Sequence, residues 1–231
     1  IIKRGYPPEK IEKFIQELAW RDYWQQIWNS KGDAINQDLK HQQHPVSNHS
    51  IPTIINTGNT GIHAIDTAIK KFYKTGYIHN HLRMYIASIT CNIGQSHWKI
   101  PAKWMYYHLL DADWASNALS WQWVAGTNAH KKYFANQDNI NKYCFTNQKK
   151  TFLDVSYEKI SSIEIPEILK ETSLLKLKTS LPKQQAIDFN KQAPTLLYNF
   201  YNIDPNWKRN IHANRILLLE PSIFYKYPIA Q

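Results

Sequence analysis

The sequence predicts an all-α domain followed by a partly irregular carboxyl-terminal extension. Apolar residues recur at helical spacing through the first 145 of the 231 residues, glycine and proline interrupt that pattern, and strand signals are absent from it. A chain of this length can bury a core large enough for one large domain, or for one domain and a small appendage. We therefore expect a multi-helical domain over 1–145 and an extension over 146–231.

The first expected helix covers residues 7–28, where prolines precede the first turn. Apolar residues recur there near helical spacing, at Ile11, Phe14, Ile15, Leu18, Tyr23 and Ile27. Residues 29–60 are rich in Asn, His, Gln, Pro and Gly with little periodicity, so mostly loop is expected. A second helix is predicted over 61–76, with Gly76 as its stop. Its apolar stripe consists of Ile62, Ile65, Ile69 and Phe72.

Three further helices are expected in the same domain. Residues 78–94 end at Gly94 and carry an apolar side made of Leu82, Ile86, Ile89 and Ile93. Residues 101–111 begin with a proline, which suits the first turn of a helix. The last helix of the domain is predicted from about 115 to 126.

The extension has a different character. Residues 146–192 are rich in lysine, contain prolines and few aromatics, and predict irregular structure with one or two short helices. The run RILLLEPSIF at 215–224 is continuously apolar, which suits a buried strand. This strand is expected to be alone, unless it pairs with a terminus or begins an α/β module that the chain lacks.

Composition limits the partners and the setting. Lysine and arginine together number 28 and aspartate and glutamate 18, an excess of ten that fits a polyanionic partner and equally a protein that is merely basic. Two cysteines cannot build a four-cysteine iron–sulfur or zinc site, so a reduced, cytoplasmic setting is expected. The start IIKRGYPPEK is not a signal peptide, and it lacks an initiator methionine, as expected of a trimmed or processed piece.

Two groups of polar side chains are candidates for a site. Glu17, Trp20 and Arg21 share one helical face, which offers an acceptor, a flat indole and a cation, or is an ordinary amphipathic face. Asn80 and Arg83 share another face. A partly buried guanidinium needs an anion, and Asp111 and Asp113 at the end of the 101–111 helix are the nearest source. This pairing is either a structural link between helices or the wall of a cofactor pocket.

Motifs of several enzyme classes are missing from the sequence. There is no HExxH, GxGxxG, GxxxxGK[ST] or GxSxG, which excludes zincins, Rossmann sites, P-loops and hydrolase elbows. His79 and His81 stand two apart on an expected helix, so they would point about 200° apart and could not chelate one ion. No metal is expected.

Three segments in this order resemble the FAD-binding helical domain of the DNA photolyase/cryptochrome family: ELAWRDYW at 17–24, residues 57–88, and DADWASNALSWQWVAGT at 111–127. The resemblance implies flavin adenine dinucleotide (FAD) folded into a U shape at the bottom of a pocket in 1–145. It also implies light-driven electron transfer from reduced flavin to a cyclobutane pyrimidine dimer that is flipped out of DNA.

The resemblance also assigns roles by position. Arg21 would meet the flavin phosphates, and Asn117 would face the flavin N5. The cofactor would be lined by Asn80, Arg83, Asp111, Asp113 and Asn117. The lesion pocket would consist of Glu17, Trp20, Asn80, Met84 and Trp123. Trp121 and Trp98 would be the inner and middle members of the chain that re-reduces the flavin.

The sequence departs from the family at several points. Leu119 and Ser120 replace a glycine pair, and His81 replaces an arginine of the lesion pocket. The Thr/Ser-rich segment that clamps the FAD phosphates and the amino-terminal antenna domain have no counterpart in it. Two alternatives therefore stand beside photolyase activity: a cryptochrome-like photoreceptor that binds FAD without repair, and a DNA-binding helical module without a cofactor.

Overall fold

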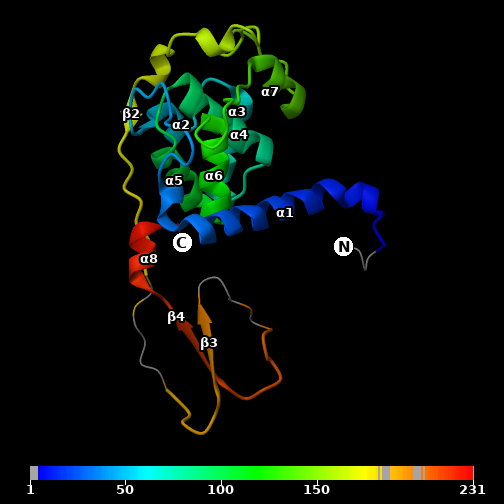
Figure 1. The fold of residues 1–231 in the computed structure, drawn as a ribbon, viewed down its shortest axis with the longest axis vertical. Coiled ribbons are helices and arrows are strands. Elements are labelled where there is room, and N and C mark those ends of the chain that lie inside the picture. The colour runs from blue at the N-terminus through cyan, green and yellow to red at the C-terminus, as the bar shows by residue number, and fades with distance from the viewer. Residues whose placement is uncertain (1–4, 182, 184–187, 200–203, 205, 231) are drawn as a thin grey trace. The chain divides into compact units, whose positions relative to one another are not determined.

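The computed structural model describes residues 5–181, 183, 188–199, 204 and 206–230 (Figure 1). The chain is mostly helical and divides into two compact units, unit 1 (Ile1–Leu177) and unit 2 (Lys178–Gln231). The expected boundary at residue 145 falls inside unit 1, because the following segment returns to that unit through a strand pair and through buried Ile160 and Leu169. The functions expected for the two parts stay predictions.

Unit 1 contains all five helices that the sequence predicts before residue 145. Its α-helices are α1 (Pro8–Lys31), α2 (Thr53–Thr57), α3 (His63–Thr75), α4 (Asn80–Ser88), α5 (Lys99–His108), α6 (Trp114–Ala125) and α7 (Gln137–Cys144). Shorter turns of 3₁₀-helix lie at η2 (Gly32–Asn36), η4 (Ile160–Ser162) and η5 (Glu167–Leu169), and η3 (Ile89–Ile93) is a π-helix that continues α4. Helix α7 was not expected from the sequence.

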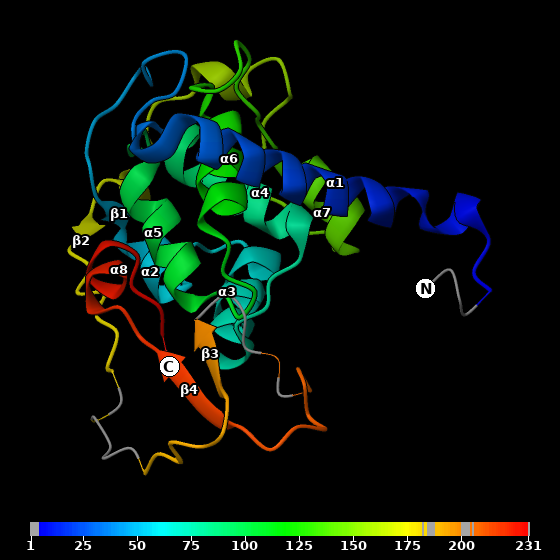
Figure 2. The same cartoon turned by 60° about the horizontal axis from the view of Figure 1, so that its bottom comes forward.

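Helix α6 is the centre of unit 1. Figures 1 and 2 show α1, α4 and α5 arranged around it, and all three helices contact it. Nine of its twelve residues are buried, which is typical of a helix enclosed by others, and they include Trp114, Leu119 and Trp121. The predicted stripe of the 61–76 helix is buried as well, at Ile62, Ile65, Ile69 and Phe72.

The burial of helix α1 differs from what the sequence predicts. It begins and ends close to the predicted bounds, but only Ile11 among its residues is buried. Phe14 is 50% exposed and Leu18 51% exposed, and Figure 2 shows the amino-terminal half of α1 extending past the other helices of unit 1. The apolar spacing predicted the helix correctly, but apart from Ile11 its apolar side chains along this half do not face a closed core.

The strands and their pairing also differ from what the sequence predicts. In unit 1, β1 (Ile51–Pro52) pairs antiparallel with β2 (Thr172–Ser173), although no strand was expected before residue 145. In unit 2, β4 (Asn214–Leu218) pairs parallel with β3 (Thr195–Asn199), so the expected lone strand has a partner. It is not a buried strand, because Leu217 and Leu218 are exposed. The apolar run then turns at Pro221 into helix α8 (Pro221–Lys226).

Gly76 ends α3 in a conformation that few other residues adopt. Its φ is +65°, and an added Cβ would lie 3.0 Å from both the backbone nitrogen and the Cβ of Leu110. We expect Gly76→Ala to lower the free energy of unfolding by about 3 kcal/mol, because backbone strain and a clash combine. In urea unfolding, Gly61→Ala is the control, since Gly61 has φ +76° with nothing within 4 Å. A smaller loss for Gly76→Ala than for Gly61→Ala would contradict the role of the Leu110 contact.

Within the described part of the chain, no helix has the length and apolar character needed to cross a bilayer.

Candidate functional site

A cavity of about 780 Å³ opens in unit 1 between α1, the start of α4, and α6. Ligand pockets usually have a volume of this order. Every site residue that the sequence predicts lines it except Trp98: Glu17, Trp20, Arg21, Asn80, Arg83, Met84, Asp111, Asp113, Asn117, Trp121 and Trp123. Segments that are far apart in the sequence thus bring the predicted side chains to one place.

Two arginines and two aspartates form a charged cluster on the pocket wall. Asp111 lies 3.3 Å from Arg21 through one carboxylate oxygen and 3.3 Å from Arg83 through the other. Arg21 also reaches Asp113 at 3.3 Å through its Nε. Because Arg21 and Asp111 are about half exposed, these ion pairs contribute little to stability. Their main effect is to fix the directions of the two guanidinium groups.

The backbone explains why the acids lie at this position. Asp113 is the N-cap of α6, and its carboxylate accepts a hydrogen bond from the backbone nitrogen of Ser116 at 3.0 Å. An acidic N-cap suits the positive end of a helix. Arg83 is fixed from the other side, since its Nε donates to the Ile78 carbonyl at 2.9 Å. The cluster is therefore built from α1, which carries Arg21, from α4, which carries Arg83, and from the start of α6 with the residues just before it.

A second polar pair joins two helices on the pocket lining. Asn80 on α4 donates its side-chain amide to the Glu17 carboxylate on α1 at 3.2 Å. Two indoles of the lining are about half exposed, Trp20 at 48% and Trp123 at 41%. Trp20 stacks on Trp24 at 5.6 Å between ring centroids, and Trp123 stacks on Tyr133 at 5.8 Å. Each exposed indole is thus supported by a neighbouring ring and leaves apolar surface for a ligand.

Two donors of the lining have no partner. Trp121 Nε1 and Ser116 Oγ are buried atoms without a hydrogen bond to any described residue. Buried polar atoms are nearly always paired in folded proteins, so unpaired donors in a cavity indicate a missing ligand atom. Asn117 lies between them on α6 and donates to the Ala102 carbonyl at 2.8 Å. Apolar walls, free donors and two guanidinium groups fit a ligand with a flat ring system and anionic groups.

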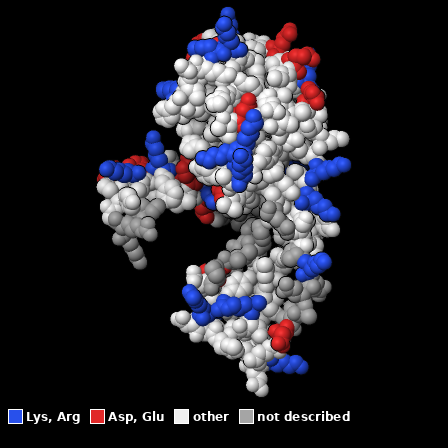
Figure 3. Space-filling model, turned by 180° about the vertical axis from the view of Figure 1, so that it is seen from behind, with Lys and Arg blue, Asp and Glu red and all other residues white. Residues whose placement is uncertain are grey.

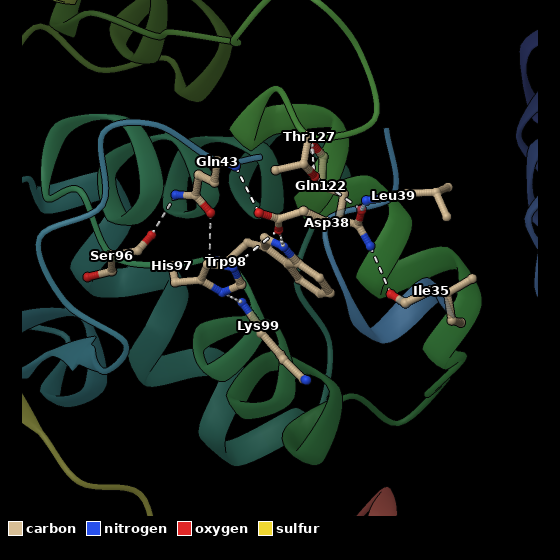
Figure 4. A network of polar contacts seen from close by, with 10 residues as sticks. All are labelled: Ile35, Asp38, Leu39, Gln43, Ser96, His97, Trp98, Lys99, Gln122 and Thr127. Atoms are coloured by element: carbon tan, nitrogen blue, oxygen red, sulfur yellow. Dashed lines mark hydrogen bonds and ion pairs between the residues drawn. The ribbon is translucent and has the colours of Figure 1, made fainter. Parts of the chain in front are cut away.

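Trp98 lies elsewhere, in a buried polar network that Figure 4 shows. Its indole nitrogen donates to Asp38 at 2.7 Å, and its backbone nitrogen donates to the Gln43 side chain at 3.0 Å. His97 lies 3.2 Å from the same Asp38 oxygen. Burial lowers the pKa of His97 below its ordinary value, although the Asp38 carboxylate opposes this shift. The network holds Trp98 in a fixed, fully buried position outside the pocket lining.

Gln122 is a residue that the sequence analysis missed. It lies between the predicted Trp121 and Trp123, and its side chain is fully buried. Its amide donates to the Ile35 carbonyl at 2.8 Å, and its oxygen accepts from the Leu39 backbone at 3.0 Å (Figure 4). A glutamine within a buried apolar helix was the available signal, because such a group needs partners.

The positions that depart from the family pattern also have defined surroundings. Leu119 is fully buried, whereas Ser120 is exposed and lines the pocket. His79 lies outside the helix that was predicted to contain it, because it is the N-cap of α4 and its ring accepts from the His81 backbone. Among the described residues, no group of three or more His, Cys, Asp or Glu side chains is arranged to hold a metal ion.

Comparisons with known proteins agree with this geometry. The model of the family described as the FAD binding domain of DNA photolyase matches residues 14–161, which is more than half of the chain. A deoxyribodipyrimidine photo-lyase of Streptomyces griseus is 33% identical over 117 residues, covering 50% of this chain and 26% of that protein. The chain spans about a quarter of the length of the first curated relatives that it matches.

Solved structures show the same fold. An archaeal photolyase from Sulfolobus tokodaii, described with two FAD molecules, matches with a TM-score of 0.54 at 23% identity, covering 62% of this chain and 33% of that one. A cryptochrome of Synechocystis sp. PCC6803 matches with a TM-score of 0.51 at 23% identity, covering 57% and 29%. With the family match over residues 14–161, the chain belongs to the photolyase/cryptochrome family of FAD-binding domains, and FAD is its cofactor.

Proposed function

We propose that the chain is the flavin-binding part of a photolyase-type enzyme, which cleaves cyclobutane pyrimidine dimers in DNA by light-driven electron transfer. The observation that carries this proposal is the composition of one pocket. It combines two guanidinium groups fixed by carboxylates with two half-exposed indoles and a paired glutamate. A pocket that binds only a flavin has no need of the half-exposed indoles and the glutamate.

The residues present fit FAD. Arg21 would supply positive charge for its phosphates, and the ion pair of Arg83 with Asp111 would lie beside its ring system, with Asp111 and Asp113 holding Arg21 in position. Asn117 and the unpaired donor of Trp121 line the same pocket and would supply polar partners for the edge of a flat ring system. When bound and reduced, FAD supplies the excited electron for the reaction, and the protein supplies orientation and charge.

The mouth of the pocket suits an extruded pyrimidine dimer. Trp20 and Trp123 offer ring faces, and stacking of a base on an aromatic ring contributes about 1–3 kcal/mol. Glu17 is an acceptor for base N–H groups, and Asn80 holds its carboxylate in place. Met84 adds a flexible apolar wall. Bases that react inside an enzyme are generally flipped out of the stack in this way.

The two buried tryptophans are proposed to re-reduce the flavin. Trp121 lines the pocket, and Trp98 lies fully buried outside it. A rigid, water-excluded position suits a residue that must transfer an electron without changing its surroundings. The Asp38 carboxylate at the Trp98 indole nitrogen favours positive charge on that ring.

A cryptochrome-like photoreceptor without repair activity is the second candidate. The match to the fold of a cryptochrome of Synechocystis sp. PCC6803 supports it. On the face drawn in Figure 3, Lys and Arg side chains lie among uncharged atoms and some Asp and Glu side chains. The lesion-binding side chains Glu17, Trp20 and Trp123 favour repair instead.

One experiment separates these candidates. The full chain with excess reduced FAD is mixed with an oligonucleotide that carries one thymine dimer, and dimer content is followed by chromatography in light and in darkness. We expect loss of the dimer only in light, and a loss at least about tenfold slower for Trp20→Ala/Trp123→Ala at equal flavin absorbance. Tyr225→Ala, at an exposed position of unit 2, is the control. Unchanged dimer content with wild-type protein would support the photoreceptor.

A further inference from the structure

A row of aromatic side chains continues from the pocket mouth over α4 and α7. We propose that this aromatic platform, formed by His81, Trp123, Tyr133 and Tyr143, stacks the unpaired bases next to the lesion in a DNA strand. It rests on the proposed function only in placing the lesion inside the pocket. The binding of flanking bases can be measured without any repair.

The rings of the platform are arranged in near-parallel pairs. Trp123 and Tyr133 lie 5.8 Å apart between centroids with 28° between their planes. His81 and Tyr143 lie 5.1 Å apart, also with 28° between planes. His79 lies 5.4 Å from His81 and lines the pocket, as Trp123 does. The platform therefore reaches the pocket at two places, through its own Trp123 and beside His79.

Further tyrosines lie beneath and near these rings. Tyr85 is fully buried and lies 6.3 Å from His81 with 18° between planes, so it forms the floor under that ring. Burial raises the pKa of Tyr133 to about 12, and the neighbouring Tyr157 and Tyr143 add to the rise. Tyr133 is therefore neutral at physiological pH and lies near Tyr143.

Core packing does not explain Tyr143 on α7 or Phe145 just after it. Among the residues of this helix only Gln137 and Ile140 are buried, whereas Tyr143 is 47% exposed. Phe145 at the end of the helix is 95% exposed and has a φ of +56°, a conformation that is uncommon for a bulky residue. Exposed aromatic surface beside a pocket indicates a binding partner.

The chemistry of the platform favours bases over a protein segment. Flat ring faces lie in near-parallel pairs, and every base has a ring face that can stack on them without regard to sequence. The Lys142 ammonium lies 5.3 Å from the Tyr143 ring centroid, where it can meet a phosphate. The acid of the same helix, Asp138, is already paired with Lys149 at 2.8 Å. The surface thus offers stacking and positive charge together.

The test measures binding of undamaged DNA in darkness by fluorescence anisotropy. The full chain with excess FAD is titrated into a labelled single-stranded oligothymidine and, separately, into a duplex of the same length. We expect Tyr143→Ala to bind the single strand about tenfold more weakly than wild type, and Tyr143→Phe to bind it like wild type, because the ring and not the hydroxyl stacks. Tyr225→Ala is again the control for a lost exposed tyrosine.

Each outcome either supports or overturns the proposal that the platform stacks bases. Unchanged single-strand affinity in Tyr143→Ala overturns it, as does a wild-type chain that binds no single strand, or an equal loss for single strand and duplex. His81→Ala tests it independently if Tyr143→Ala loses the circular dichroism of the folded chain. If Tyr143→Ala weakens single-strand binding but the wild-type chain removes no dimer in light, the platform is supported and the proposed repair activity is overturned.

Discussion

Replacing Gln122 by leucine is expected to lower the free energy of unfolding by about 4 kcal/mol, a large part of the stability of an ordinary domain. Gln122 is fully buried and connects α6 to the segment that follows α1. Leucine has nearly the same size but no polar atoms. The Ile35 carbonyl and the Leu39 backbone nitrogen would then lose their partner inside the protein, and each such loss costs about 1–3 kcal/mol.

Urea unfolding followed by tryptophan fluorescence measures this effect. Gln26→Leu is the matched control, since Gln26 is exposed on α1 and its replacement is expected to change the free energy of unfolding by less than about 0.5 kcal/mol. A loss below about 1 kcal/mol for Gln122→Leu would mean that water replaces the missing amide, and that the network is not a rigid support for Trp121 and Trp123.

Removing the Asp111 carboxylate is expected to separate binding from stability. In Asp111→Ala, we expect the dissociation constant of FAD to rise at least about tenfold, because both guanidinium groups lose the acceptor that orients them. The free energy of unfolding should change by less than about 1 kcal/mol, since Asp111 and Arg21 are about half exposed. Quenching of flavin fluorescence measures the first quantity and urea unfolding the second.

The control removes an exposed aspartate from another ion pair. Asp138 pairs with Lys149 at 2.8 Å on the surface, so Asp138→Ala should leave FAD binding unchanged. A variant Asp111→Ala that unfolds more easily but keeps its FAD affinity would show the opposite role. The arginine–aspartate cluster would then be a structural link between helices, as the sequence alone also allowed.

Periodicity predicted the helices well where a core is present on their apolar side. The isoleucine stripe of α3 is buried as expected, and Gly76 ends the helix in the left-handed conformation that favours glycine. The apolar residues of α1 also recur near helical spacing but are less sharply confined to one face, and Phe14 and Leu18 are exposed. Spacing determines that a helix has an apolar face, whereas burial depends on whether another element packs against that face.

Short polar elements could not be predicted in the same way. Helix α7 begins after its N-cap Asn136, whose side chain accepts from the Asn139 backbone, and its only buried apolar residue is Ile140. A single apolar contact gives no periodic signal. Strand β4 was likewise expected without a partner. It pairs in parallel with β3, and parallel strands are joined by a long connection, so the pairing leaves no local signal in the sequence.

The sequence by itself determined the helical order, the family resemblance and the residue types of the pocket. Those features depend on local spacing and on side-chain chemistry, both of which are readable along the chain. Only the tertiary structure decided that Asp111 joins both arginines, that Trp98 lies apart beside Asp38, and that the rings of α4 and α7 meet. These are contacts between distant segments, and their geometry follows from how the helices pack around α6.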